Sequence, residues 1–259
     1  HPDGTSVDVV DLFFNTPARR KFLRAEKTEF NHIETLIKRI AMSRPDVTFL
    51  LKHNGKLVKR YRGQAAMQGT VQDELNAHSQ RIDEVIGNRF AQQARCRSLT
   101  YDKIEIKAWV KSPESCVSVN PAQYAFVNQR MMRDKLIQHA IRQAFADSLH
   151  REQQPEYVIF IDVPATDVDV NVHPAKHEVR FHHARLLHDL VVKVIQDALA
   201  EFEQKQEALI SDPDSESQDA PAWLAEPNQA YSQAVADNQV PRSELATKTN
   251  RPQTYSALK

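Results

Sequence analysis

The residues best suited to chemistry lie between Val168 and Phe181, where the sequence reads VDVNVHPAKHEVRF. Alternation on both sides predicts two short strands joined by a tight connection, and Pro174 favours an extended conformation for the residue before it. Lys176 then lies at or near the tip of this connection. Because a lysine ammonium is a compact charge suited to a phosphate, the pattern indicates a phosphate contact, although a solvated turn lysine has the same signature.

Histidines also gather here, at positions 173, 177, 182, 183 and 188. His173 and His177 would share one face of a helix, but Pro174 disfavours a helix at that point. The sequence contains no HExxH, and both cysteines lie far away at Cys96 and Cys116. It therefore predicts no metal site.

A second candidate site is a basic stretch around the start of a predicted helix. Arg130 and Arg133 precede Asp134, the predicted N-cap, and Lys135 and Arg142 follow it. Cations near a helix start oppose the helix dipole, so their presence favours an anionic ligand. We expect the four cations to form a strip that binds DNA phosphates regardless of sequence, the alternative being a solvated helix end.

A third segment, Asp11–Leu23, reads DLFFNTPARRKFL. Thr16 and Pro17 are typical of the N-cap and first position of a helix. The basic residues from Arg19 to Arg24 are more often a solvated face than a nucleic-acid contact. No Ser-His-Asp grouping in the sequence has a spacing suited to nucleophilic catalysis.

Composition narrows the possible functions. The chain has 259 residues but only 5 glycines, which form neither GxGxxG nor a P-loop, so it carries no complete glycine cradle for a nucleotide phosphate. No apolar run approaches the roughly 20 residues of a membrane helix, and no signal-peptide pattern is present. The two cysteines form no CxxC, which favours a reducing, cytosolic compartment.

Charge is uneven along the chain. The formal net charge is zero, but residues 203–259 carry nine acidic and five basic side chains, which leaves +4 on the preceding residues. That excess permits a polyanionic partner without requiring one. The chain also begins at His1 rather than at a methionine, and this predicts a fragment of a longer protein.

Hydrophobic periodicity predicts strands that alternate with single helices. Strands are expected over residues 5–13, 47–51, 57–61, 104–110, 124–128, 157–163, 168–172 and 178–181. Helices are expected from residue 28 to before Pro45 and over 71–78, 85–90, 134–149 and 185–202. Residues 203–259 are rich in Gln, Ser, Asp, Pro and Ala and predict a disordered linker.

The three segments together resemble the bacterial MutL family of DNA mismatch repair proteins, particularly its gammaproteobacterial members. The matching stretches are residues 4–23, 127–130 and 169–176, and the resemblance covers about residues 3–202. Each stretch alone is weak evidence for the family, but the three stretches in this order are specific to it. A topoisomerase of the same GHKL ATPase group would have Gln-Thr-Lys where this chain has His-Pro-Ala-Lys.

The resemblance implies an α/β (α+β) fold with three parts. Residues 1–65 would be the C-terminal portion of the GHKL ATPase sandwich. Residues 66–202 would form a transducer and DNA-binding domain that resembles the second domain of small-subunit ribosomal protein five. Residues 203–259 would be a disordered linker. Thr5 would lie near the adenine of ATP and Lys176 would reach its γ-phosphate. The family's magnesium ligands and general base would lie upstream, so this fragment alone is expected to hydrolyse no ATP.

The same resemblance implies an ATP-dependent role in mismatch repair that links mismatch recognition to strand incision and unwinding. The implied partners are single- and double-stranded DNA, MutS, MutH and a helicase, with a homodimeric intact protein in the cytoplasm at the nucleoid and no membrane. Lys135 stands where close relatives often have arginine. The alternative is a non-catalytic nucleic-acid-binding α/β module of ribosomal-protein type, which would have no reason for the HPAK turn.

Overall fold

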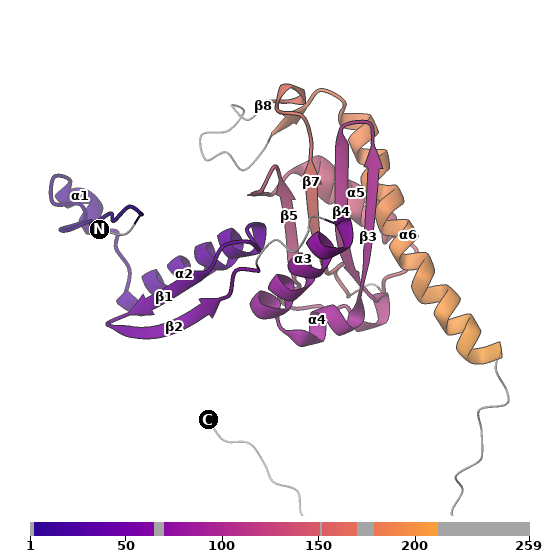
Figure 1. Ribbon diagram of the computed structural model, residues 1–259, viewed down its shortest axis with the longest axis horizontal. Helices are drawn as coiled ribbons and strands as arrows, with labels where there is room; N and C mark the ends of the chain where they lie inside the picture. The colour runs from indigo at the N-terminus through magenta and orange to yellow at the C-terminus, as the bar shows by residue number, and fades with distance from the viewer. Residues whose placement is uncertain (1–2, 65–69, 151, 170–178, 212–259) are drawn as a thin grey trace, which may run out of the picture. The chain divides into compact units, whose positions relative to one another are not determined.

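The computed structural model describes residues 3–64, 70–150, 152–169 and 179–211, which belong to one compact unit (Figure 1). The helices are α1 (Pro17–Arg20), α2 (Glu26–Ser43), α3 (Val71–Ile86), α4 (Asn88–Gln93), α5 (Lys135–Ala144) and α6 (Ala184–Ser211). The strands are β1 (Phe49–His53), β2 (Lys56–Tyr61), β3 (Ala94–Tyr101), β4 (Ile104–Lys111), β5 (Gln123–Val127), β6 (Arg130–Met132), β7 (Tyr157–Asp162), β8 (Val168–Asp169) and β9 (Arg180–Phe181).

A five-stranded mixed sheet forms the centre, in the order β3-β4-β7-β5-β6. Only the β5–β7 pair is parallel, and Phe126 lies opposite Phe160 in its register. Strand β7 is buried from Tyr157 to Ile161, as expected for an apolar strand covered on both faces. The predicted mixed α/β class is thus confirmed.

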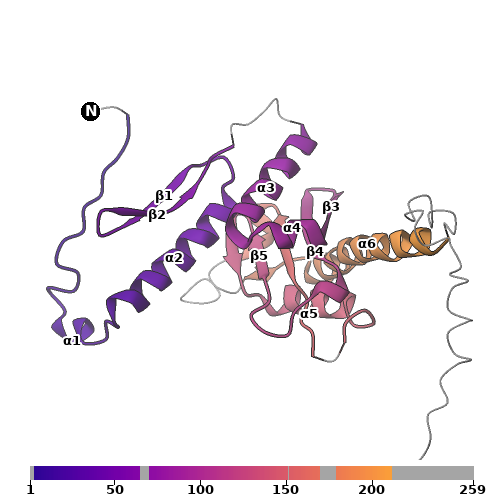
Figure 2. The same cartoon turned by 90° about the horizontal axis from the view of Figure 1, so that it is seen from below.

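Helices cover both faces of this sheet. On one face, α5 and α6 bury residues such as Ile137, Ile141 and Val191 against the strands. The other face is covered by α3 and α4 (Figure 2). There, Ile82 of α3 and Phe90 of α4 pack with an aromatic group that includes Phe126 and Phe160. This second core also includes Met42, at the carboxyl end of α2.

The predicted hairpin between β1 and β2 is confirmed. Asn54 and Gly55 have φ values of 48° and 76°, the left-handed conformation that a two-residue type I′ turn requires at both positions. Phe30 of α2 stacks on His53 of β1 with ring centroids 4.2 Å apart.

Arg81 of α3 joins α2 and the hairpin to the rest of this unit. Its side chain is 1% exposed. The guanidinium donates to five main-chain carbonyls: Nη1 to Ala41 (2.6 Å) and Arg44 (3.1 Å), and Nη2 to Pro45 (3.2 Å), Val47 (2.9 Å) and Arg62 (2.7 Å). A cation at the carboxyl end of α2 also suits the helix dipole there.

The strand predicted over residues 5–13 is wrong. Residues 4–10 have no regular secondary structure, and Val7, Val9 and Val10 are 83%, 70% and 72% exposed. An alternating sequence becomes a strand only where a neighbouring strand accepts its hydrogen bonds, and the described residues provide none beside it. The predicted helix start at Thr16-Pro17 is confirmed, but α1 is only 4 residues long.

Other element boundaries in the structure differ from the predicted ones. Residues 71–86 form one helix, and α5 ends at Ala144, earlier than expected. Helix α6 continues to Ser211, nine residues past the expected end, so the predicted linker does not begin at residue 203. The edge strands β3 and β6 were not predicted. The division at residue 65 stays a prediction, and residues 212–259 lie outside the described residues.

Candidate nucleic-acid interface

Helix α5 is fixed in place by its cap and its buried face. Asp134, 7% exposed, accepts hydrogen bonds on Oδ1 from the main-chain nitrogens of Leu136 (2.9 Å) and Ile137 (3.3 Å), as the sequence predicts. Ile137, Ala140, Ile141 and Ala144 are buried. The opposite side of the helix therefore faces solvent.

The four predicted DNA contacts lie on or beside that exposed side. Arg130 begins β6, Arg133 lies in the connection, Lys135 begins α5, and all three are exposed. Arg142, also exposed, lies two turns along α5, about 10 Å from Lys135 at the usual helical rise, and its Nε donates to the carbonyl of Gln138 (3.2 Å). We call these four residues the α5 strip.

The β5–β6 turn orients the start of the strip. Asn128 and Gln129 have φ values of 46° and 65°. Asn128 donates its main-chain N–H to the carbonyl of Ile161 (2.9 Å), and its Oδ1 accepts from the nitrogen of Val163 (2.9 Å). These bonds hold the turn against the end of β7 and present Arg130 at the edge of the sheet.

The predicted nucleotide contacts are Thr5 and Lys176. Thr5 is exposed in an irregular segment, and Lys176 lies outside the described residues. Among the described residues, no group of three or more histidine, cysteine, aspartate or glutamate side chains is arranged to hold a metal ion. No helix in the described ranges is long and apolar enough to cross a membrane.

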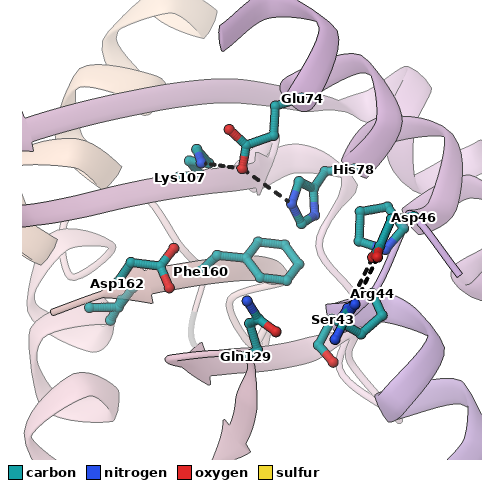
Figure 3. Close-up of a pocket in the computed structure, with 11 residues that line it drawn as sticks. Ser43, Arg44, Asp46, Glu74, His78, Lys107, Gln129, Phe160 and Asp162 are labelled. Atoms are coloured by element: carbon teal, nitrogen blue, oxygen red, sulfur yellow. Dashed lines mark hydrogen bonds and ion pairs between the residues drawn. The ribbon is translucent and has the colours of Figure 1, made fainter. Parts of the chain in front are cut away.

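Figure 3 shows a pocket of about 220 Å³ between the carboxyl end of α2, α3, β4 and β7. Lys107 Nζ contacts Glu74 (2.7 Å) and, beside the pocket, Glu105 (3.1 Å), and Arg44 contacts Asp46 (2.7 Å). Burial alone lowers the pKa of Lys107, but its hydrogen bonds to Glu74 and Glu105 raise that pKa overall. Asp162 also lines the pocket and makes no ion pair among the described residues, and burial raises the pKa of its carboxyl group.

His78 lines the same pocket and is held neutral. Burial lowers its pKa to about 4. Its ring packs 4.4 Å from the centroid of Phe160 and 5.8 Å from that of Trp109, and its Nδ1 has no hydrogen-bond partner. An imidazole in this setting is an aromatic packing element at neutral pH.

One residue of the exposed side of α5 was missed from sequence. His139 follows Lys135 by four residues and precedes Arg142 by three, so the three side chains form one exposed row along the helix. That spacing was readable from the sequence. The contact between His139 and His188 on α6 was not, because the two residues lie 49 positions apart.

Comparison with known proteins adds family information. The family model described as DNA mismatch repair protein, C-terminal domain, matches residues 82–200. A DNA mismatch repair protein MutL from Aliivibrio fischeri is 54% identical over 77% of this chain and 29% of its own length. One from Serratia proteamaculans is 43% identical over 95% of this chain and 38% of its own length. The chain thus spans about a third of each of these relatives.

One solved structure supports the fold. The N-terminal domain of a DNA repair protein superimposes with a TM-score of 0.57 at 16% identity, over 74% of this chain and 58% of that one. The Aquifex aeolicus MutL ATPase domain complexed with ADP gives a TM-score of 0.43 at 23% identity, over 70% of this chain and 55% of that one. The ribosomal-type alternative is not favoured by these relatives. With 54% identity over three quarters of its length, the chain belongs to the bacterial MutL family of DNA mismatch repair proteins.

Proposed function

We propose that this chain supplies the DNA-binding surface of a MutL-type ATPase, and that the α5 strip binds DNA phosphates without regard to sequence. The observation that carries the proposal is that all four cations are exposed, Arg130 and Arg133 just before α5 and Lys135 and Arg142 on the side of α5 opposite its buried face. Each phosphate contact releases counterions, so such binding is strong at low salt and weakens as salt is added. Contacts to phosphate position the protein but read no bases.

Reversing one charge of the strip tests this proposal. We expect Lys135→Glu to weaken binding to single- and double-stranded DNA by about tenfold and to flatten the salt dependence by about one to two units, because the charge changes by two. Fluorescence anisotropy of labelled oligonucleotides at several salt concentrations measures both quantities.

The matched control is Lys103→Glu, the same charge change at an exposed residue of the β3–β4 turn. It should leave affinity and salt slope near those of the unaltered chain. If the two variants behave alike, the α5 strip is a solvated helix end and the proposal is wrong.

We propose further that the intact protein binds ATP with Mg²⁺, with Lys176 at the γ-phosphate and Thr5 near the adenine. The described residues do not by themselves form a nucleotide pocket, since Thr5 is exposed and no metal-holding group is found among them. Most nucleotide contacts would therefore come from other parts of the longer protein. The support is the HPAK segment and membership of the family.

Replacing Lys176 in the full-length protein tests the nucleotide assignment. Lys176→Ala should lower ATP turnover by about a hundredfold, the usual cost of losing one donor to a developing charge. Lys103→Ala is the control, and the 259-residue chain alone, expected to hydrolyse no ATP, gives the baseline. Turnover of Lys176→Ala equal to that of the control would remove Lys176 from the site.

The remaining assignments follow from the family. We propose that the intact protein is a homodimer acting in the cytoplasm at the nucleoid, where it coordinates MutS, MutH and a helicase in mismatch repair. The proposed domains are residues 1–65 for the ATPase portion and 66–202 for the transducer, with the linker following α6. Pull-down of MutS with the full-length protein, with and without ATP, tests the first of these partnerships.

A further inference from the structure

A chain of hydrogen bonds runs from the α5 strip to the first turns of α6. Nδ1 of His139 lies 3.1 Å from Nε2 of His188, and Nδ1 of His188 lies 3.0 Å from Oδ1 of Asp189. The His139 ring is exposed, whereas the His188 side chain is only 19% exposed. The described part of α5 thus presents His139 between Lys135 and Arg142, with its other ring nitrogen, Nε2, left for a ligand.

The direction of these hydrogen bonds fixes where the protons are. An ionised carboxylate only accepts, so His188 carries a hydrogen on Nδ1 when it contacts Asp189. If the His188 ring is neutral, its Nε2 is then a bare acceptor, and the 3.1 Å contact requires a hydrogen on Nδ1 of His139. A neutral His139 in that tautomer has a bare Nε2, which cannot bond a phosphate oxygen.

One added proton reverses this. If His188 holds the charge, its Nε2 donates to Nδ1 of His139, and the hydrogen of His139 moves to Nε2. If His139 holds the charge, both of its nitrogens carry hydrogens. In either case Nε2 of His139 becomes a donor, in line with the neighbouring cations on α5.

From this geometry we infer that His139 is a further phosphate-binding residue, which contacts DNA only when the His139–His188 pair takes up a proton, and that His188 and Asp189 are its positioning residues. The inference rests on the proposed DNA-binding function and deepens it. The DNA-bound protein would therefore carry up to one more proton than the free protein does.

The surrounding charges couple that proton to DNA. Among the described residues within a turn of the pair on α5 and α6, the charged groups are Lys135, Arg142 and Arg185, three cations, and the single carboxylate of Asp189. His182 and His183, both exposed, lie in the segment before α6. A phosphate placed between Lys135 and Arg142 lies beside the pair and attracts the positive charge that the added proton brings.

The test measures DNA affinity of the full chain at two pH values. Histidine changes charge between about pH 5 and pH 8, so we expect binding about tenfold tighter at about pH 6 than at about pH 8, the value of one charge-assisted hydrogen bond. The salt slope should be steeper by about one unit at the lower pH. His139→Gln should abolish both differences. Asp189→Asn should flatten the pH profile, because an amide can donate as well as accept and therefore no longer holds the hydrogen of His188 on Nδ1.

His32→Gln, at an exposed position of α2, is the matched control and should keep the full pH dependence. If the unaltered chain binds DNA with the same pH profile as His139→Gln, the inference is wrong while the DNA-binding function stands. If the unaltered chain and Lys135→Glu bind equally poorly at both pH values, the function itself fails. Nitrogen chemical shifts give a readout without DNA: at about pH 8 a hydrogen on Nε2 rather than Nδ1 of His139 would also overturn the inference.

Discussion

Replacing Arg81 with methionine is expected to lower the free energy of unfolding by about 3–5 kcal/mol, the usual cost of removing one partner from a buried charged network. The guanidinium is 1% exposed and serves five carbonyls. A methionine fills much of the space but donates nothing, so the carbonyls of Val47 and Arg62 would lose the guanidinium hydrogen bonds that they accept. The carbonyls of Ala41, Arg44 and Pro45 would each keep one main-chain hydrogen bond, from Arg44, Val47 and Gln64 respectively. Urea unfolding followed by circular dichroism measures the loss.

Arg60→Met makes the same change at an exposed position of β2 and should cost little. Arg81→Lys should fall between the two, because three ammonium donors cannot satisfy five acceptors. Amide hydrogen exchange should speed up at residues 44–48 in Arg81→Met. Equal urea midpoints for Arg81→Met and Arg60→Met would show that the carbonyl contacts contribute nothing to stability.

The second large effect is a loss of stability in acid caused by His78. Its pKa is lowered to about 4 in the folded chain by burial, whereas a histidine in the unfolded chain keeps its ordinary value of 6.5. Between these two pKa values the unfolded state binds more protons than the folded state. The contribution of neutral His78 to the free energy of unfolding is therefore complete above about pH 6.5 and is lost as the pH falls toward 4. One such group changes the free energy of unfolding by about 1.4 kcal/mol per pH unit at the steepest point. The total loss between the two pKa values is about 3 kcal/mol.

His78→Phe isolates this contribution. Phenylalanine can keep the contacts with Phe160 and Trp109, and Nδ1 of His78 has no hydrogen-bond partner to lose. The substitution does remove the 4.0 Å contact of His78 Nε2 with Glu74, which Figure 3 shows. The free energy of unfolding of the variant should therefore depend less steeply on pH between about 6.5 and 4, while His32→Gln should follow the unaltered chain. Identical pH slopes in His78→Phe and the unaltered chain would mean that His78 is protonated in the folded state.

The parts of the fold that could be predicted from sequence are those that local interactions decide. The Asn54-Gly55 turn, the Asp134 cap and the apolar strand starting at Tyr157 each depend on residues close together in the chain. Strand β3 was missed because an edge strand with the sequence ARCRSLTY has no clear alternation. The segment around Val7 has alternation but, among the described residues, no neighbouring strand.

In the candidate site, too, local sequence predicted some features and missed others. The four cations of the α5 strip were identified from the helix start, and the structure places all of them at exposed positions. Contacts made across the fold carry no local signal, as the His139–His188 pair illustrates. Arg81 is an extreme case, since its hydrogen bonds go to main-chain carbonyls, which no residue type in the sequence marks. Its ion pair with Glu84 (3.4 Å), three residues along α3, is a contact that helical spacing can indicate.

The five carbonyl contacts of Arg81 also bear on how the protein folds as it is made. Arg81 lies 40 residues after Ala41 and 19 after Arg62. At a synthesis rate of about 5–20 residues per second, α2 and the hairpin leave the ribosome several seconds before Arg81 does. During that interval water must solvate the carboxyl end of α2. Helix α2 and the β1–β2 hairpin therefore reach their final packing only once α3 has been synthesised.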